Sequence, residues 1–405
     1  DNNAVRVECR RMGGGFGGKE TQSGHMAVWA ALAALKFGKP VKLRMDRDDD
    51  FMVTGKRHPF AYDYTAGFDA RGRLCGLQLM MAANCGFSAD LSGPVADRAI
   101  FHADNAYFLE DVAIASYRCK LNTQSHTAFR GFGGPQGMVV IEAIMGDIAR
   151  RLGLDPLAVR QRNLYGIGER DVTHYQMKVE DNILAPLLAR LAADSHYTER
   201  RATLAAWNAQ SPVIKRGIAL TPVKFGISFT ATLFNQAGAL VHVYTDGSVL
   251  VNHGGTEMGQ GLFTKVAQVV ADVFKVDLGR VRVTATSTDK VPNTSATAAS
   301  SGTDLNGMAA QDAAQKLRKR LVEFAAEKWS VDAQAIDFTP EGVRIGDTLV
   351  AFADLIKAAY MGRVALSATG FYKTPEIHWD RDEGKGRPFY YFAWGAACTE
   401  VTVDT

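Results

Sequence analysis

The chain has 405 residues, of which 47% are hydrophobic and 22% charged. It can therefore bury a large core, and at this length we expect more than one domain. Its net charge is only +3, from 46 basic and 43 acidic residues, so the charge does not indicate a nucleic-acid partner. No apolar stretch reaches the roughly 20 residues of a membrane-spanning helix, and we expect neither a membrane nor a nucleic acid among its partners.

The five cysteines are scattered, odd in number and form no CxxC pair. This distribution argues against a disulfide framework, an iron–sulfur cluster or a structural zinc site in the chain. The nine histidines also lack the spacing of metal ligands, so we expect any metal to be held within a cofactor. A reducing compartment is the default for such a chain, and we expect the cytoplasm.

The first half of the chain alternates strand and helix patterns. Residues 5–9 alternate as a strand does, and residues 23–37 carry the apolar pattern of a buried helix. The mixed charges of residues 44–50 predict a solvated loop, and residues 69–72 a hairpin turn. Further strands are expected at 41–45, 60–68 and 74–83, and further helices at 134–152, 155–163 and 182–208.

A polar stretch at residues 207–212 indicates a domain boundary, which we place so that 1–210 and 211–405 form two domains. Because strand hairpins and helices mix in both halves, the sequence predicts an α+β fold. In the second half we expect strands at 215–230, 238–244, 249–253, 281–286 and 390–403, and helices at 261–274 and 305–330.

Two glycine-rich arms, GGGFGGKE at residues 13–20 and AFRGFGGPQ at residues 128–136, are the most informative feature of the chain. Glycine lets the backbone approach a ligand without a Cβ in the way, and phenylalanine rings supply stacking faces. One such arm alone is as well explained by a turn beside a core. Two arms, each followed by a helical pattern, predict a ligand site built from several loops.

Two further loops, residues 254–261 and 293–302, extend this set. Each precedes a predicted helix, where free backbone N–H groups and the helix dipole favour an anion such as phosphate. Taken singly, glycine- and hydroxyl-rich loops often only cap helices. Their weight comes from being the third and fourth members of the set.

In chain order, these four loops resemble the pterin-binding loops of the xanthine dehydrogenase/xanthine oxidase family of molybdenum hydroxylases. The resemblance extends to the whole chain through residues 84–86, 91–92, 97–99, 226–230 and 371–375. It implies two mixed α/β subdomains with a molybdenum–molybdopterin cofactor between them. In this family the molybdenum carries oxo, sulfido and hydroxide ligands, and the pterin rather than a protein side chain holds it.

The resemblance implies a set of cofactor contacts. Gly14, Gly15 and Phe16 would surround the oxo group through their backbone, and the Arg130 fork suits pterin carbonyl and phosphate oxygens. Phe16, Arg130 and Ala299 would line the metal centre. The Gln260 amide offers both a donor and an acceptor. The other cofactor contacts would come from Met258, Gly259, Thr297, Ala299, Ser300 and Ser301.

The resemblance also implies a purine pocket with Glu20 and Arg98 on opposite walls, both acting in catalysis. They would bind the N–H and C=O edges of the ring, and Arg98 would stabilise negative charge that develops on the substrate oxygen. Phe132 and Phe229 would sandwich the ring. The remaining walls would come from Leu91, Phe129, Thr230, Phe234, Ala298 and Ala299.

Aldehyde-oxidising relatives generally have uncharged residues at the positions of Glu20 and Arg98, so the resemblance implies oxidation of hypoxanthine to xanthine and of xanthine to urate. Three alternatives stay open. Glu20 and Arg98 could form a buried ion pair, with Phe132 and Phe229 as core aromatics. The substrate could be an aldehyde or another N-heterocycle. The chain could also be a non-catalytic cofactor-binding fragment.

The family's general base, a glutamate, would fall beyond Thr405, so we expect this chain by itself to bind the cofactor weakly and to turn over poorly. The two [2Fe–2S] clusters and the FAD that accept electrons would lie on other domains or subunits. Family members are commonly dimers of the full assembly, and we expect the same here.

Overall fold

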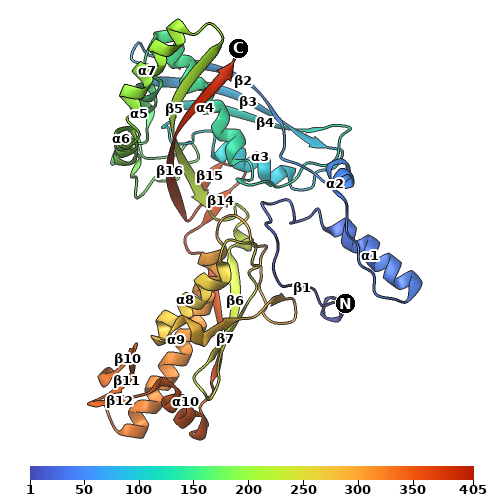
Figure 1. The fold of residues 1–405 in the computed structure, drawn as a ribbon, viewed down its shortest axis with the longest axis vertical. Helices are drawn as coiled ribbons and strands as arrows, with labels where there is room; N and C mark the ends of the chain where they lie inside the picture. Colours follow the sequence, from blue (N-terminus) through green and yellow to red (C-terminus); the bar gives the residue numbers. More distant parts are fainter. The chain divides into compact units, whose positions relative to one another are not determined.

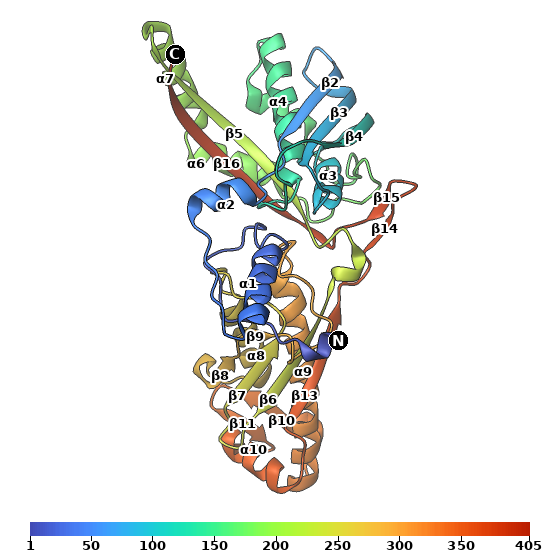
Figure 2. The ribbon, with the colours of Figure 1, turned by 90° about the vertical axis from the view of Figure 1, so that its right-hand side faces the viewer.

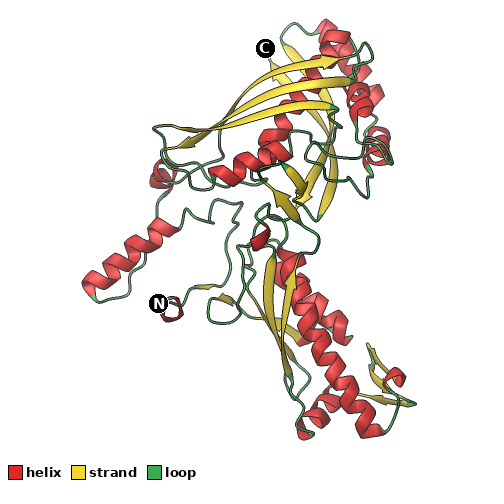
Figure 3. Cartoon of the chain, turned by 180° about the vertical axis from the view of Figure 1, so that it is seen from behind, coloured by secondary structure: helices red, strands yellow, loops and turns green.

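The computed structural model describes residues 1–405, which form two compact units. Unit 1 comprises Asp1–Gly15 and Ala231–Glu376, and unit 2 comprises Phe16–Thr230 and Ile377–Thr405. Helices and sheets occur in both units (Figures 1 and 3). The predicted α+β class is therefore confirmed.

Unit 1 is built on a four-stranded sheet against which two long helices pack (Figure 2). The pair β7–β8 is parallel, and the other pairs are antiparallel. Five alanines of α9 are fully buried, which lets this helix pack closely. In spatial order the strands are β13 (Ser367–Lys373), β6 (Gln236–Val243), β7 (Val249–His253) and β8 (Val281–Val283), and the helices are α8 (Leu262–Phe274) and α9 (Gly302–Trp329).

Two smaller sheets complete unit 1. The predicted strand at 5–9 is reduced to β1 (Glu8–Cys9), which pairs antiparallel with β9 (Thr286–Ser287). The other small sheet is three-stranded and precedes α10 (Phe352–Met361). Its strands are β10 (Ile336–Thr339), β11 (Gly342–Ile345) and β12 (Thr348–Val350).

Unit 2 contains a three-stranded sheet, a long antiparallel ribbon and most of the helices. Its largest core is formed by apolar residues of the sheet and of α4, including Leu79, Met81, Ile141 and Ile144. The sheet consists of β2 (Phe60–Phe68), β3 (Leu74–Gly86) and β4 (Asp111–Lys120), the ribbon of β5 (Ile214–Ile227) and β16 (Tyr391–Asp404), and the helices beside them are α3 (Ser92–Phe101), α4 (Gly134–Leu152) and α5 (Pro156–Asn163).

The predicted boundary between segments 1–210 and 211–405 follows the last residue of α7 (Tyr197–Gln210). On its far side, β5 pairs along its whole length with β16, and both strands belong to unit 2. The two compact units thus have other bounds than the two predicted segments. The division of the sequence into domains 1–210 and 211–405 stays a prediction.

Several other predicted elements also differ from the structure. Helix α1 (Gly24–Phe37) forms, but none of its residues is buried, and Leu35 is 83% exposed. Residues 41–45 form no strand, because no neighbouring strand pairs with their backbone groups. Residues 44–50 are exposed or half-buried as expected, yet α2 (Arg47–Val53) begins within them, capped by the Asp46 carboxylate.

The predicted helix at 182–208 is two helices. α6 (Leu184–Asp194) ends at Ser195, and His196 adopts a left-handed φ of 50° before α7 begins. None of the helices of the chain combines the length and the apolar character that a membrane crossing requires.

Candidate functional site

In unit 1, three of the predicted cofactor segments lie together. The N-terminal arm reaches the loop at 254–261, where the Met12 N–H donates to Glu257 O at 2.9 Å. The Thr256 N–H of the same loop donates to Thr297 Oγ1 at 2.8 Å. The fold therefore brings the first, third and fourth predicted loops into contact.

The first arm meets this loop at Gly15, next to the Met258 side chain. A Cβ placed on Gly15 would lie 2.6 Å from Met258 Sδ, closer than van der Waals contact allows. The absence of a side chain at Gly15 lets the backbone and the Met258 thioether lie this close together.

The loop at 254–261 differs from the prediction in one respect. The Glu257 carboxylate accepts hydrogen bonds from the N–H groups of Gly259 (2.9 Å), Gly261 (3.1 Å) and Phe263 (3.0 Å). These are the donors at the start of α8, so the predicted anion site there is wrong, because the chain supplies its own anion. Desolvation favours the protonated carboxyl, but these N–H bonds outweigh it and lower the pKa of Glu257.

Glu257→Ala should lower the free energy of unfolding by about 1–2 kcal/mol, since three backbone donors lose a charged acceptor. Glu257→Gln, which keeps one acceptor oxygen without the charge, should lose less. Urea unfolding of the chain followed by circular dichroism measures both. An unchanged midpoint for Glu257→Ala would show that the cap contributes nothing.

Gln260 also bonds within the loop rather than presenting a free amide. Its Nε2 donates to Thr256 O at 2.9 Å, and its Oε1 accepts from the Met258 N–H at 2.6 Å. Each end of the amide thus makes one bond within the loop and keeps one donor or acceptor position for a ligand. Gln260 holds the positions of Met258 and Gly259, which would contact a ligand through their own atoms.

The fourth loop carries backbone strain at two predicted cofactor residues. Ala299 and Ser300 adopt left-handed φ values of 55° and 58°, which cost non-glycine residues on the order of 1–3 kcal/mol each. Ser301 is buried, and its Oγ donates to Ala298 O at 3.2 Å just before α9. Such strain is typical of sites where backbone groups are held for a ligand.

In unit 2, the remainder of the first arm lies against the second. A Cβ on Gly17 would lie 3.0 Å from the carbonyl carbon of Ala128, and the hydroxyls of Thr21 and Thr127 are 3.3 Å apart. Phe16 and Phe132 occupy corresponding places in the two arms and share left-handed φ values of 51° and 50°. The predicted association of the two arms is therefore confirmed within this unit.

The second arm also packs on the helix that carries Arg98. Gly133 has a φ of 96°, and a Cβ there would collide with Val95 O of α3. A Cβ on Gly137, in the first turn of α4, would likewise collide with Ala99 O. Only glycine allows α3, the arm and α4 to approach this closely.

Arg57, which the sequence did not single out, fixes the second arm. Its Nη2 donates to Arg130 O at 2.7 Å, and its guanidinium lies 4.7 Å above the Phe129 ring. The Arg130 side chain itself is exposed and makes no hydrogen bond or ion pair. Arg57 therefore orders the backbone of Arg130 while the guanidinium of Arg130 stays available to a ligand.

Arg98 is only 3% exposed, and its Nη2 donates to Ser228 O at 2.6 Å and to Gly226 O at 3.2 Å. The guanidinium lies 5.1 Å from the rings of both Phe225 and Phe389. Burial lowers the pKa of Arg98 to about 10, which leaves it charged at neutral pH. No carboxylate pairs with it, so the alternative of a buried Glu20–Arg98 ion pair is wrong.

Glu20 ends the first arm near the N-terminus of α3. Although the residue reaches solvent, desolvation by the surrounding protein, with a smaller contribution from Asp90, raises the pKa of its carboxyl to about 7. Asp90 in turn accepts hydrogen bonds from Thr21 and Gln22. Glu20 is therefore an acid that can exchange a proton near neutral pH.

The Glu20 carboxyl keeps its proton to about pH 7 in the folded chain, against an ordinary pKa of 4.5. Its contribution to stability is thus full below pH 4.5 and is lost as the pH rises through 7. Glu20→Gln should match the unchanged chain at pH 4 and exceed it above pH 7, by less than about 1 kcal/mol because solvent screens the charge. Urea unfolding at a series of pH values measures this difference, and a constant difference would contradict the assignment.

The predicted site residues divide between the two units. Arg57 and Glu257 were missed by sequence reasoning, because neither stands in a position that a sequence signal marks: Glu257 lies four residues before the N-cap Gly261, not in the first turn of α8 where a capping-box glutamate stands. Unit 2 holds Phe16, Glu20, Leu91, Arg98, Phe129, Arg130, Phe132, Phe229 and Thr230, and unit 1 holds Gly14, Gly15, Phe234, Met258, Gly259, Gln260, Thr297, Ala298, Ala299, Ser300 and Ser301.

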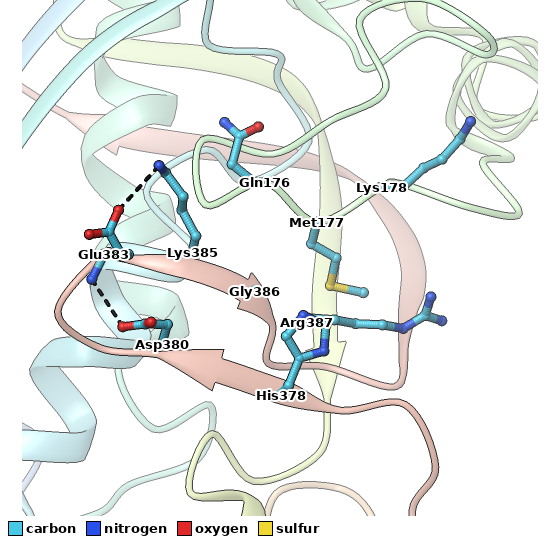
Figure 4. A pocket seen from close by; sticks show the side chains of 9 residues that line it. All are labelled: Gln176, Met177, Lys178, His378, Asp380, Glu383, Lys385, Gly386 and Arg387. Carbon is cyan, nitrogen blue, oxygen red and sulfur yellow. Dashed lines mark hydrogen bonds and ion pairs between the residues drawn. The ribbon is translucent and has the colours of Figure 1, made fainter.

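A separate hollow of about 530 Å³ lies in unit 2 between the hairpin of β14 (His378–Asp380) and β15 (Lys385–Arg387) and the loop at 176–178 (Figure 4). Its charged side chains are paired: Lys385 lies 3.5 Å from Glu383, and Arg387 lies 3.1 Å from Glu180. None of the predicted site residues lines it. This hollow is therefore not the candidate site.

Comparison with protein-family models gives two matches, both described as molybdopterin cofactor-binding domains, at residues 1–164 and 190–405. The chain belongs to the molybdopterin cofactor-binding domain family. It is 45% identical over 403 residues to xanthine dehydrogenase/oxidase of Gallus gallus, and 44% identical over 406 residues to xanthine dehydrogenase of Dictyostelium discoideum. Each alignment covers all of this chain but only 28% of the relative's length.

Among solved structures, quinoline 2-oxidoreductase from Pseudomonas putida 86 matches with a TM-score of 0.82 and 20% identity. The match covers 99% of this chain and 52% of that chain. At this identity the likeness shows that the molybdopterin-binding chain shares the fold.

The residues of the molybdopterin-binding chain fit a pterin cofactor. The donors of Arg130 are exposed and unpaired, which suits the carbonyl and phosphate oxygens of such a ligand. Next to Gly13 no atom lies within 4 Å of the place a Cβ would take, and Ala299 and Ser300 are held in a conformation that their side chains disfavour. The confirmed cofactor class therefore agrees with the chemistry of these loops, and no group of three or more His, Cys, Asp or Glu side chains gathers where it could hold a metal ion.

Proposed function

We propose that this chain forms part of a xanthine dehydrogenase-type molybdenum hydroxylase, which oxidises hypoxanthine to xanthine and xanthine to urate. The observation that carries the proposal is the state of Arg98, a buried cation without a carboxylate partner. Its Nη2 is fixed by two carbonyls, whereas Nη1 and Nε make no hydrogen bond in the chain. A purine carbonyl would supply the missing acceptor, while an aldehyde substrate has no second polar edge to bind there.

The cofactor would be bound through backbone groups more than side chains. In unit 1, Gly14, Gly15 and the segments 258–260 and 297–301 would contact the pterin. In unit 2, Phe16 and Arg130 would lie beside the metal centre, as Ala299 would from its own unit. When bound, the cofactor supplies the redox-active metal and the oxygen transferred to the substrate.

The substrate would be oriented by charge and stacking. Arg98 would bind a ring carbonyl and stabilise the negative charge that develops on it. Glu20, with a pKa near 7, would donate a proton to or accept one from the opposite edge of the ring. Phe132 and Phe229 would hold the ring between them. The other walls would come from Leu91, Phe129, Thr230, Phe234, Ala298 and Ala299.

We further propose that electrons leave through [2Fe–2S] clusters and FAD on other domains or subunits, and that the full assembly is a cytoplasmic dimer. Support comes from the relatives that are named xanthine dehydrogenase. This chain spans 28% of their length, which leaves room in the relatives for further domains.

Expression of the complete open reading frame that contains this chain tests the proposal. The purified protein should contain molybdenum and oxidise hypoxanthine and xanthine, with urate formation followed by absorbance. Oxidation of benzaldehyde or quinoline without oxidation of xanthine would replace the purine assignment by one of the alternatives. Molybdenum content without any turnover would favour a cofactor-binding role alone.

A further inference from the structure

His102, the residue that follows α3, is fully buried and bonds in two directions. Its Nδ1 lies 3.0 Å from Arg98 O, and its Nε2 lies 3.0 Å from the Gly226 nitrogen. Because a backbone N–H can only donate, Nε2 must be the acceptor. The neutral ring therefore carries its proton on Nδ1 and donates it to Arg98 O.

The imidazole and the Arg98 guanidinium share the same aromatic surroundings. The His102 ring lies 4.9 Å from the Phe225 ring and 5.3 Å from the Phe389 ring. The Arg98 guanidinium lies 5.1 Å from each of these two rings. A displacement of His102 would therefore displace the surfaces against which Arg98 rests.

Gly226 is held on both sides by this arrangement. Its N–H donates to His102, and its carbonyl accepts from Arg98 Nη2, which also binds Ser228 O. Ser228 has a φ of 152°, unusual for a non-glycine residue, and its Oγ donates to Pro388 O at 2.8 Å. The next residue is Phe229, so the constrained end of β5 leads directly into the proposed stacking residue.

Neutrality of the ring is required for this role, since a protonated Nε2 could not accept from Gly226. Desolvation, followed by the nearby charges of Arg98 and Lys224, holds the pKa of His102 well below its ordinary value. The Lys224 ammonium lies 3.1 Å from Asp104 Oδ2, which keeps the net charge of the cluster low.

We propose that His102 is a positioning residue for purine recognition, which fixes the helix that carries Arg98 against the strand end that leads to Phe229. This inference rests on the proposed function, because purine binding needs the guanidinium and the ring face to address one substrate together. An aldehyde requires neither contact, so its oxidation should not change when His102 is replaced.

His102→Leu, made in the complete protein, replaces the imidazole by an apolar side chain of similar size and removes both hydrogen bonds. We expect kcat/KM for xanthine to fall about 10- to 100-fold, mostly through KM. The kcat/KM for benzaldehyde and the molybdenum content should both stay within about twofold of the unchanged protein, because benzaldehyde uses neither of the contacts that His102 positions. His102→Gln, which can restore the acceptor for the Gly226 N–H, should recover part of the loss.

His174→Leu is a matched control. The His174 side chain is only 7% exposed and bonds α3, with Nε2 2.9 Å from Ile100 O, but it makes no bond to the 226–228 segment. It should lower stability without changing the ratio of xanthine to benzaldehyde oxidation.

If His102→Leu leaves the ratio of kcat/KM for xanthine to kcat/KM for benzaldehyde unchanged, the positioning role alone is overturned. If the leucine variant yields no holoenzyme, the same ratio measured on His102→Gln and His102→Asn decides, since each keeps only part of the bonding. Failure of the unchanged protein to oxidise xanthine would instead overturn the proposed function, and this inference with it.

Discussion

Replacing Arg98 by methionine in the complete protein should lower kcat/KM for xanthine about 10²- to 10³-fold. The expected loss matches the removal of one preorganised donor to a developing oxyanion, about 3–4 kcal/mol. Arg98 meets the requirements of such a donor because it is buried, charged at neutral pH and fixed by Ser228 O and Gly226 O. Steady-state kinetics normalised to molybdenum content, with xanthine and benzaldehyde as substrates, measures the effect.

Oxidation of benzaldehyde should survive this substitution, since an aldehyde has no ring carbonyl for Arg98 to bind. Arg98→Lys keeps the charge but not the planar fork, so its kcat/KM for xanthine should lie between the values of the unchanged protein and of Arg98→Met. Arg160 offers a structural control: it is buried and bonded to Glu142 at 2.8 Å, outside the proposed pocket. If Arg98→Met impairs both substrates as much as Arg160→Met does, the purine assignment of Arg98 fails.

Local chemistry made several elements predictable. The strand at 60–68 and the helix at 134–152 have the predicted bounds. Both are bounded by residues that fix the backbone: the turn after β2 pairs it with β3, and glycines with left-handed φ stand at each end of α4. Where a turn or cap defines an element, the sequence carries the information within a few residues.

Elements that depend on distant partners were less predictable. The pattern at 23–37 indicates a helix, but whether α1 is buried depends on what packs against it, and the apolar side of α1 stays exposed. The alternation in β4 was not recognised, and this strand pairs parallel with β3. β16 joins β5 across more than 160 residues of sequence, which no local pattern encodes.

The same distinction applies to the candidate site. The glycine-rich arms predicted a close approach of the backbone to a ligand, and in the structure Gly17 and Gly133 let the chain pack closely against Ala128 and Val95. The sequence could not show that Glu257 occupies the donors of α8, nor that Gln260 bonds within its own loop. Those outcomes depend on side-chain orientation, which residue type alone leaves open.

Lys224→Met should destabilise unit 2 by about 3–5 kcal/mol, the range for removing one partner of a buried ion pair. The Lys224 ammonium lies 3.1 Å from Asp104 Oδ2, and both side chains are completely buried. Asp104 would keep the Tyr165 hydroxyl, which donates to it at 2.6 Å, and His174 Nδ1, which lies 3.8 Å from Asp104 Oδ2. Urea unfolding of the chain, followed by the fluorescence of Trp379 and Trp394 beside this core, measures the loss.

The double variant Lys224→Met with Asp104→Leu separates charge from packing. If the penalty of the single variant comes from an uncompensated carboxylate, removing that carboxylate should restore much of the stability. Lys316→Met is the exposed counterpart, since its 2.7 Å pair with Asp312 is open to solvent and should contribute less than about 1 kcal/mol. If Lys224→Met is no more destabilising than Lys316→Met, the buried pair of Lys224 and Asp104 contributes no more to stability than the exposed pair of Lys316 and Asp312.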